Sequence, residues 1–310
     1  MIDTTASPAP LVSVIIATYN RSATLRWTIE SVLRQTCADF ELLVIGDACM
    51  DDTAEVVASF GDPRIRWINL PVNTGSQSGP NSEGLRRARG RYIAYLGHDD
   101  LWFPWRLSGM TEALESSGDD FVHGLVALLA PEGVRGVAGK PPEGQAYGTF
   151  NAPPSGWLHR RSIVDVIGYW ADPASLSRPI DVEYLGRAYK AGLKVRHLPA
   201  LSVLKWPSAW WRAYALTEGY PQAHFAALMS SDPKAAYDEV MQGIAIRLAE
   251  DWDPRVPVRV SARRLALSLQ HVVGQSPLWS RWPLSDVARW RAQQFRRRSR
   301  RDRGLGSPSQ

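Results

Sequence analysis

Two adjacent carboxylates, Asp99 and Asp100, follow a short apolar stretch at residues 92–96 that lies between two glycines. This stretch has the length and composition of a buried strand. Ligands of parallel α/β sheets bind beyond the carboxyl ends of the strands, so the pair would lie where a hard cation that bridges two phosphates finds oxygen ligands. The structural alternative is that one aspartate only caps the next helix.

Two more polar residues follow apolar stretches nearer the start of the chain. Tyr19 comes after the β-branched run at residues 11–17, and Asp47 comes after the run at residues 40–45. A tyrosine at a strand end can stack its ring on a nucleobase while its hydroxyl stays in water. A carboxylate there can accept a hydrogen bond from the imide of uracil or thymine. A core tyrosine and a helix cap are the alternatives.

The elements that would position these residues alternate between strands and helices. Strands are expected at residues 11–17, 40–45, 64–70 and 92–96, and the segments between them have the apolar spacing of helices. A polar, glycine-rich loop at residues 73–81 has a backbone that could approach a phosphate or ribose. This alternation predicts an α/β fold with a doubly wound, mostly parallel sheet flanked by helices.

The second half of the chain is less regular. Residues 131–154 are rich in glycine and proline and are expected to form a long loop over the sheet. A strand is predicted at 155–161, a helix that begins at Asp181 is predicted at 180–191, and two short strands are predicted at 194–204.

The composition of the 310-residue chain favours a cytoplasmic protein. The first ten residues lack the basic start and the apolar centre of a signal peptide. No apolar run reaches the roughly 18 residues that span a bilayer. The two cysteines, Cys37 and Cys49, do not suggest a disulfide framework, which favours a reducing compartment.

Basic residues concentrate near the end of the chain. Nine arginines and two aspartates lie between Arg281 and Arg303, and their net charge exceeds the +5 of the whole chain, so the rest is nearly neutral. Trp279, Trp282 and Trp290 are interleaved with these arginines, a pattern typical of peripheral contact with an anionic membrane. Nucleic-acid binding or a solvated helix end would have a similar composition. The neutral body argues against a nucleic-acid partner.

In their order and spacing, these motifs resemble the inverting family 2 glycosyltransferases of the GT-A fold, which use nucleotide-sugar donors. The resemblance extends to about residue 205. The matching segments are residues 12–21, 31–36, 40–47, 51–53, 88–100, 157–168 and 181–192. The resemblance implies a GT-A type fold with a helical C-terminal extension, and transfer of a sugar to a hydroxyl group.

The resemblance makes Asp99 the candidate ligand of a divalent metal, either Mn²⁺ or Mg²⁺. The family usually has an aspartate two positions earlier, where this chain has Gly97. With fewer carboxylates the metal site could be weaker, and phosphates and water would supply the remaining ligands. His98 as a ligand would favour Mn²⁺ over Mg²⁺. Asp100 is expected to orient neighbouring backbone or acceptor groups.

By the same resemblance, Asp181 is the candidate catalytic base, which would take the proton of the acceptor hydroxyl as the diphosphate leaves. A helix cap is the alternative explanation of an aspartate here, and Glu183 is the second candidate base. Relatives often carry a histidine shortly after the strands that follow. This chain has Lys205 there, which could contact the diphosphate as a point charge.

The expected nucleotide-binding residues lie at strand ends and in the neighbouring loops. They are Ala17, Thr18, Tyr19, Arg21, Asp47, Asn81, His98 and Lys205. Three further residues, Asp100, Trp157 and Glu183, are expected to contact the acceptor or to support the reacting groups. For Trp157, packing in the core is the alternative.

These patterns divide the chain into four expected parts. They are an N-terminal tail at 1–10, a catalytic domain at 11–208, a helical C-terminal region at 209–302 and a disordered tail at 303–310. The catalytic domain comprises a nucleotide-binding half at 11–103 and an acceptor half at 104–208.

The expected function is transfer of a sugar from a nucleotide diphosphate sugar, with UDP favoured, to a hydroxyl of a polysaccharide, cell-envelope or lipid-linked glycan. The enzyme would be cytoplasmic and could dock at the inner face of the membrane. The alternative is a nucleotide-sugar-binding protein with impaired catalysis, because Gly97 replaces an acidic residue.

Overall fold

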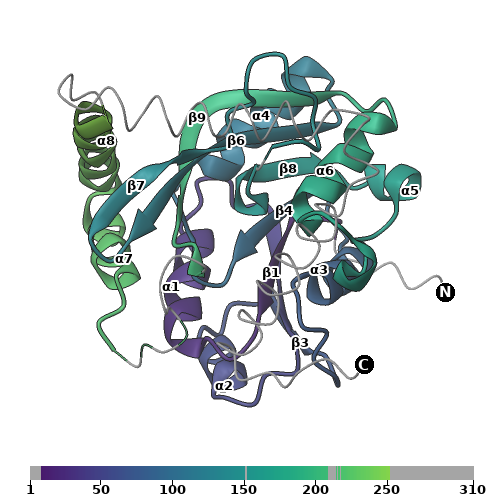
Figure 1. Cartoon of the computed structure of the whole chain (residues 1–310). Coiled ribbons are helices and arrows are strands. Elements are labelled where there is room, and N and C mark those ends of the chain that lie inside the picture. The colour runs from purple at the N-terminus through teal and green to yellow at the C-terminus, as the bar shows by residue number, and fades with distance from the viewer. Residues whose placement is uncertain (1–7, 151, 209–213, 215, 217, 252–310) are drawn as a thin grey trace, which may run out of the picture.

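A computed structural model describes residues 8–150, 152–208, 214, 216 and 218–251 (Figure 1). In chain order the elements are β1 (Val12–Thr18), α1 (Ser22–Leu33), β2 (Phe40–Gly46), α2 (Thr53–Ala58), β3 (Ile65–Asn69), α3 (Ser78–Arg87), β4 (Tyr92–Gly97), β5 (Leu101–Trp102), α4 (Arg106–Ser117), β6 (Phe121–Ala130), β7 (Gly133–Ala138), β8 (Trp157–Arg160), α5 (Ile163–Ile167), α6 (Ile180–Lys190), β9 (Val195–Lys205), α7 (Gln222–Ser231) and α8 (Pro233–Asp251), with short 3₁₀ turns at Pro154–Gly156 and Pro173–Ser175. The predicted helices beyond residue 251 and the basic Trp/Arg segment lie outside the described residues.

The strands described here form one twisted sheet in the order β3-β2-β1-β4-β8-β6-β9-β5, with β7 paired to β6. β3, β2, β1 and β4 are parallel neighbours, whereas β8 runs antiparallel to both β4 and β6. The register places Ala17 beside Gly97 and Thr18 beside Gly46. The doubly wound α/β fold is therefore confirmed, and the carboxyl ends of β1, β2 and β4 meet at one edge.

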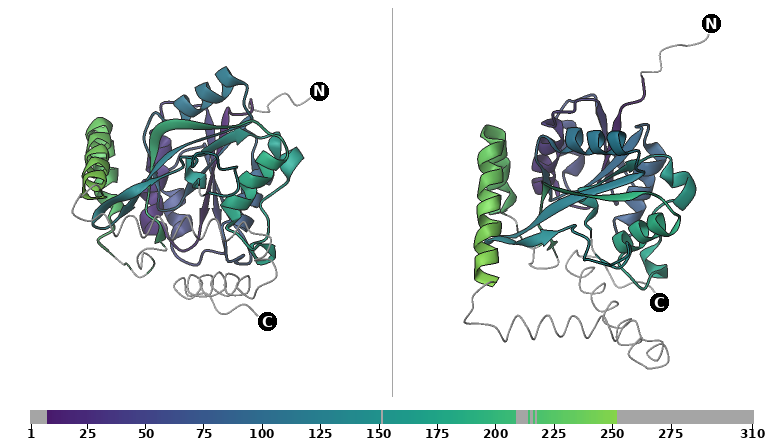
Figure 2. Two further views of the ribbon diagram at one scale, coloured as in Figure 1. Left: turned by 45° about the horizontal axis from the view of Figure 1, so that its top comes forward. Right: turned by 90° about the horizontal axis from the view of Figure 1, so that it is seen from above.

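Helices cover both faces of the sheet, which explains why its central strands are apolar at almost every position (Figures 1 and 2). On one face, α1 and α4 pack their apolar residues against alternate residues of β1. On the other face, α3, α5 and α6 pack against Ile15 and the residues that point the same way. Leu25, Ile29 and Val32 of α1 are fully buried. Each such side chain contributes about 1.5–3 kcal/mol to the hydrophobic stabilisation.

Three predictions of local structure were wrong. The expected loop at 131–154 contains the strand β7, which forms an edge hairpin with β6 and whose glycines mask the strand pattern. The two expected strands at 194–204 form one strand, β9, although Pro199 interrupts the pattern and the pairing with β6 shifts register. Helix α3 starts at Ser78, inside the expected loop, because Pro80 is tolerated in a first helical turn.

The loop between β7 and β8 is anchored by a close approach of two backbones. Gly148 has a φ of +88°, and a Cβ atom added to Gly186 of α6 would lie 2.8 Å from the Gly148 Cα atom. Arg178 also donates a hydrogen bond to the carbonyl oxygen of Gly148 (3.2 Å). This contact fixes the course of the loop where it passes α6, shortly before it reaches Pro153 and Ser155 at the sheet edge.

We predict that Gly186→Ala lowers the free energy of unfolding by about 1–3 kcal/mol, because its methyl group overpacks the contact with Gly148. The matched control is Gly109→Ala in α4, where a Cβ atom has no neighbour within 4 Å and should stabilise the helix by roughly 0.5–1 kcal/mol. Urea unfolding of both variants measures the difference. Equal effects in the two helices would contradict the proposed anchor.

Candidate functional site

A cavity of about 130 Å³ opens at the carboxyl edge of the sheet. Five elements or their ends contribute to its wall, and each brings one chemically relevant residue: Ala17 from β1, Asn81 from α3, Gly97 from β4, Asp181 from α6 and Lys205 from β9. The remaining wall is made by Gln77, Tyr95, Leu96, Pro153, Pro154 and Ser155. The structure thus brings together four residues that the sequence proposed for one site: Ala17, Asn81, Asp181 and Lys205.

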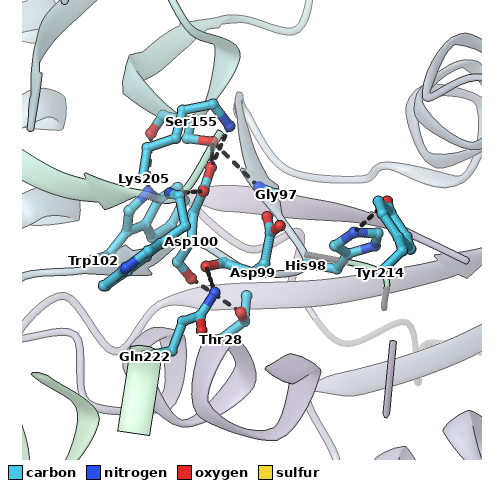
Figure 3. Close-up of polar contacts among 11 residues, drawn as sticks. Thr28, Gly97, His98, Asp99, Asp100, Trp102, Ser155, Lys205, Tyr214 and Gln222 are labelled. Carbon is cyan, nitrogen blue, oxygen red and sulfur yellow. Dashed lines mark hydrogen bonds and ion pairs between the residues drawn. The ribbon is translucent and has the colours of Figure 1, made fainter. Parts of the chain in front are cut away.

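Asp100 is fully buried behind this cavity, and polar groups surround its carboxylate (Figure 3). Ser155 Oγ donates to Oδ2 at 2.5 Å, Lys205 Nζ donates to the same oxygen at 2.8 Å, and the Trp206 backbone N–H donates to Oδ1 at 3.3 Å. Its carbonyl oxygen accepts a hydrogen bond from Thr28 of α1. Asp100 therefore ties the end of β9 to the loop after β4, which agrees with the expected orienting role.

Asp100 and Lys205 each stabilise the charged form of the other. Burial raises the pKa of Asp100, and the neighbouring ammonium of Lys205 opposes that rise. Burial would lower the pKa of Lys205, but the negative charges of Asp100, Asp99 and Asp181 outweigh this effect and raise it. Lys205 is therefore a permanent positive charge at the wall of the cavity.

Asp99 lies beside this pair and is 7% exposed. Its carbonyl oxygen accepts a hydrogen bond from Gln222 Nε2 at the start of α7 (3.2 Å). Within the described residues, no group of three histidine, cysteine or acidic side chains is arranged to hold a metal ion. Protein carboxylates therefore supply a sparse ligand set here, and a cation at Asp99 would need phosphate oxygens and water to complete its shell.

His98 links the end of β1 to the segment before α7. Its Nδ1 atom accepts a long hydrogen bond from the Tyr19 backbone N–H (3.4 Å), and its Nε2 atom lies 3.2 Å from the Tyr214 hydroxyl. The guanidinium of Arg21 lies 4.8 Å from the centre of the Tyr214 ring, a cation–π distance. Both ring nitrogens of His98 are engaged in positioning Tyr19 and Tyr214, which favours that role over metal binding.

Asp47 shapes the loop that follows β3. Its carboxylate accepts hydrogen bonds from the backbone N–H and hydroxyl of Thr74, both at 2.8 Å, and from the Gly75 backbone N–H at 3.2 Å. The next residue, Ala48, has a φ of +60°, a left-handed conformation that costs about 1 kcal/mol or more outside glycine. The strand end is held in a strained, well-defined shape.

Asp181 lies in the first turn of α6, whose N-terminal flanking residue is Pro179, so Asp181 is not the helix cap. Its Oδ1 atom accepts a hydrogen bond from the Val182 backbone N–H (3.0 Å). Burial raises its pKa, while this hydrogen bond and the charge of Lys205 lower it. Net elevation of the pKa of a carboxyl group that faces a cavity is typical of a catalytic acid or base.

The other candidates from α6 and β8 lie away from the cavity wall. Glu183 forms an ion pair with Arg187 one turn later (2.9 Å). Trp157 is fully buried, donates a hydrogen bond to the carbonyl oxygen of Ala152 (2.8 Å) and stacks on Trp170. The core packing considered for Trp157 is what the structure shows.

Two features of the wall had no strong signal in the sequence. Ser155, which bonds to Asp100, is one serine among many in a loop region. Asn81 was expected to bind a nucleotide from a loop, but it lies in α3, is 2% exposed, and its side-chain amide makes no hydrogen bond within the described residues. An amide side chain at the wall of a cavity can bond to a polar ligand.

The comparison with protein families decides the assignment. Residues 13–140 match the model of Glycosyl transferase family 2. These residues form a domain of this glycosyltransferase family. The matched segment runs from β1 to the residues just after β7, so it contains the strand ends of the cavity but not Asp181 or Lys205.

Individual relatives agree with this family assignment. The chain is 34% identical over 133 residues to the Escherichia coli protein WfaP, a "UDP-Glc:alpha-D-GlcNAc-diphosphoundecaprenol beta-1,3-glucosyltransferase". The aligned residues make up 43% of this chain and 53% of WfaP. The chain spans about half or less of the length of the curated relatives WfaP, WfgD and ExoO.

Solved structures show the same fold. The crystal structure of S. aureus TarS 1-349 superposes with a TM-score of 0.54 at 15% sequence identity and covers 73% of this chain and 72% of TarS 1-349. A mannosyltransferase from Pyrobaculum calidifontis, solved in complex with GDP-Man and Mn²⁺, superposes with a TM-score of 0.51 at 16% identity, over 94% of this chain and 88% of that one. These likenesses confirm the GT-A type of fold for the family 2 domain.

We predict that the pKa of Asp181 lies above the ordinary carboxyl value of about 3.9 and that Lys205→Met raises it further. The second shift follows because the lysine charge stabilises the ionised carboxylate and its loss removes that stabilisation. A ¹³C NMR titration of aspartate carboxyl groups, with Asp181→Asn for assignment, measures both values. An ordinary pKa in the wild type, or a downward shift in Lys205→Met, would show that this electrostatic description is incorrect.

Proposed function

We propose that the chain is an inverting glycosyltransferase that moves a sugar from a nucleotide diphosphate sugar to a hydroxyl group of a glycan acceptor. The observation that carries this proposal is the placement of Asp181 and Lys205 in the wall of one cavity at the carboxyl edge of the sheet. Displacement of a diphosphate by an alcohol needs a base for the alcohol proton and is helped by a positive charge near the diphosphate, and this cavity has both groups. The match of residues 13–140 to Glycosyl transferase family 2 supports the same reaction class.

In this reaction the acceptor oxygen attacks the anomeric carbon of the donor from the side opposite the diphosphate. The bond from that carbon to the diphosphate oxygen breaks as the new glycosidic bond forms, and the configuration inverts. The carboxylate of Asp181 takes the proton of the acceptor hydroxyl, and the positive charge of Lys205 favours the departing diphosphate. The raised pKa of Asp181 brings its basicity closer to neutrality, as a general base requires.

Uridine diphosphate is the favoured donor nucleotide. The printed name of WfaP specifies UDP-Glc, and TarS 1-349 has been solved in complex with UDP and with UDP-GlcNAc. The Pyrobaculum structure with GDP-Man makes GDP the main competitor. Tyr19 follows the end of β1, and Asp47 follows the end of β2 and binds the loop after β3. The base is proposed to bind at these strand ends.

A divalent cation, Mn²⁺ or Mg²⁺, would be held by Asp99 together with the donor phosphates. When bound, it would neutralise charge on the departing diphosphate. Because the described residues offer so few carboxylates at this position, we expect the cation to bind with the nucleotide rather than before it.

A lipid-linked or cell-envelope glycan is the proposed acceptor, in line with the diphosphoundecaprenol-linked substrate in the name of WfaP. Among the described helices, none combines the length and the apolar character needed to cross a bilayer. A cytoplasmic location and a peripheral membrane contact through the basic Trp/Arg segment stay predictions, and that segment lies outside the described residues.

We predict that Asp181→Asn lowers kcat by about 10²–10⁴ while the dissociation constant for UDP changes little, because the base acts on the acceptor and not on the nucleotide. Glu183→Gln is the matched control. Its carboxylate is paired with Arg187 away from the cavity, so it should retain most of the activity. Steady-state transfer from a panel of UDP-sugars and UDP calorimetry measure the two quantities. Loss of activity in Glu183→Gln alone would move the base to Glu183.

We also predict that Asp99→Ala removes the increase in UDP affinity that metal produces. Calorimetry with UDP, GDP and dTDP, each with Mn²⁺, Mg²⁺ or EDTA, measures this increase and ranks the nucleotides. Asp39→Ala is the control, because that residue is exposed in the loop before β2. Metal-dependent binding that survives in Asp99→Ala would overturn the ligand assignment. Nucleotide binding without any sugar transfer would favour the alternative of a binding protein with impaired catalysis.

A further inference from the structure

Gly97 leaves space that the Asp100 carboxylate uses. A Cβ atom added to Gly97 would lie 2.7 Å from Asp100 Oδ2 and 3.1 Å from its carboxyl carbon. Real Cβ atoms do not approach other atoms at 2.7 Å, so any side chain at position 97 would push the Asp100 carboxylate out of its present place. The absence of a side chain at Gly97 and the position of Asp100 are therefore linked sterically.

The same oxygen of Asp100 holds Lys205. Oδ2 accepts hydrogen bonds from both Ser155 Oγ and Lys205 Nζ, and the Gly97 backbone N–H in turn donates to Ser155 Oγ at 3.2 Å. Figure 3 shows these side chains converging on one carboxylate. A displaced Asp100 would release Lys205 from the only side chain that holds it within the described residues.

Lys205 has binding capacity left toward the cavity. An ammonium group has three N–H donors, and Asp100 is the one partner of Lys205 within the part of the chain that the structure describes. Its side chain is 25% exposed and lies in the cavity wall with Asp181 and Asn81. The remaining donors are available to an anionic oxygen in the cavity.

Gly97 also affects the charge near the carboxyl end of β4. Lys205 forms an ion pair with the buried Asp100, and Asp99 and Asp181 are the other carboxylates close enough to act on its charge. An acidic residue at position 97 would add a further negative charge and would disturb the lysine as well. With Gly97, an incoming diphosphate meets one fewer negative charge and a lysine that is already in place.

We propose that Gly97 and Asp100 position Lys205 as a built-in cation for the donor diphosphate, so that the site binds a nucleoside diphosphate to a measurable extent without metal. This inference rests on the proposed function, because it requires a nucleoside diphosphate in the cavity. Gly97 and Asp100 are positioning residues, and Lys205 makes the contact.

Calorimetry of UDP binding in EDTA, and then in Mn²⁺, tests the proposal on the full chain. We expect the wild type to bind UDP in EDTA and Lys205→Met to bind it at least tenfold more weakly, as the loss of a charge-assisted hydrogen bond implies. Lys205→Arg should retain most of the affinity. Lys190→Met is the matched control, because this lysine is exposed at the far end of α6 and should bind like the wild type.

Gly97→Ala tests the positioning step without changing any charge. Its methyl group displaces Asp100 and should weaken UDP binding in EDTA several-fold, while the gain in affinity from Mn²⁺ through Asp99 persists. Thermal unfolding of each variant checks that it is folded. If Lys205→Met fails to fold, Lys205→Arg and Gly97→Ala decide the question.

The outcomes separate this inference from the proposed function. UDP binding that requires Mn²⁺ in the wild type would overturn the inference and leave the proposed function in place. Equal affinity of Lys205→Met and the wild type in EDTA would do the same. No binding of UDP, GDP or dTDP under any condition would overturn the proposed function, and the inference with it.

Discussion

The buried ion pair between Asp100 and Lys205 is the interaction on which the site depends. It joins the loop after β4 to the end of β9, and Ser155 and the Trp206 backbone bind the same carboxylate. A buried carboxylate left without its partner costs about 3–5 kcal/mol, so all these groups must be in place together. The pair therefore fixes the position of β9, in the mixed half of the sheet, relative to the loop after β4, in the parallel half.

The geometry of the cavity follows from this constraint. Parallel pairing brings the ends of β1 and β4 together, with Ala17 beside Gly97, but it does not bring in Asp181 or Lys205. Lys205 reaches the cavity because the end of β9 lies against Asp100. Asp181 reaches it from α6, which contacts the loop before β8 through Gly186 and Gly148. The two candidate groups, Asp181 and Lys205, belong to the second half of the fold and line a cavity to which the strand ends of the first half also contribute.

The sequence predicted the parts of this arrangement that depend on local patterns. Residues 11–17 and 40–45 are apolar at nearly every position because helices cover both faces of the sheet, and this signal placed β1 and β2 correctly. β7 was missed because glycines dilute its alternation, and β9 was divided because Pro199 resembles a break. The hydrogen bonds around the Asp100 carboxylate could not be predicted from the sequence. Ser155 and Lys205 lie 55 and 105 residues from Asp100, and no local sequence pattern indicates such contacts.

The state of the polar groups in the cavity wall indicates what the cavity is built to hold. Asp100 is fully satisfied by protein atoms, which makes it a structural anchor. The Asn81 amide makes no hydrogen bond within the described residues, and the Asp181 carboxylate accepts a hydrogen bond from the Val182 backbone N–H. Such groups can bond to a polar ligand that enters the cavity. A sugar hydroxyl for Asn81, an acceptor hydroxyl for Asp181 and a phosphate oxygen for Lys205 would satisfy all three, which is the composition of a nucleotide sugar meeting an alcohol.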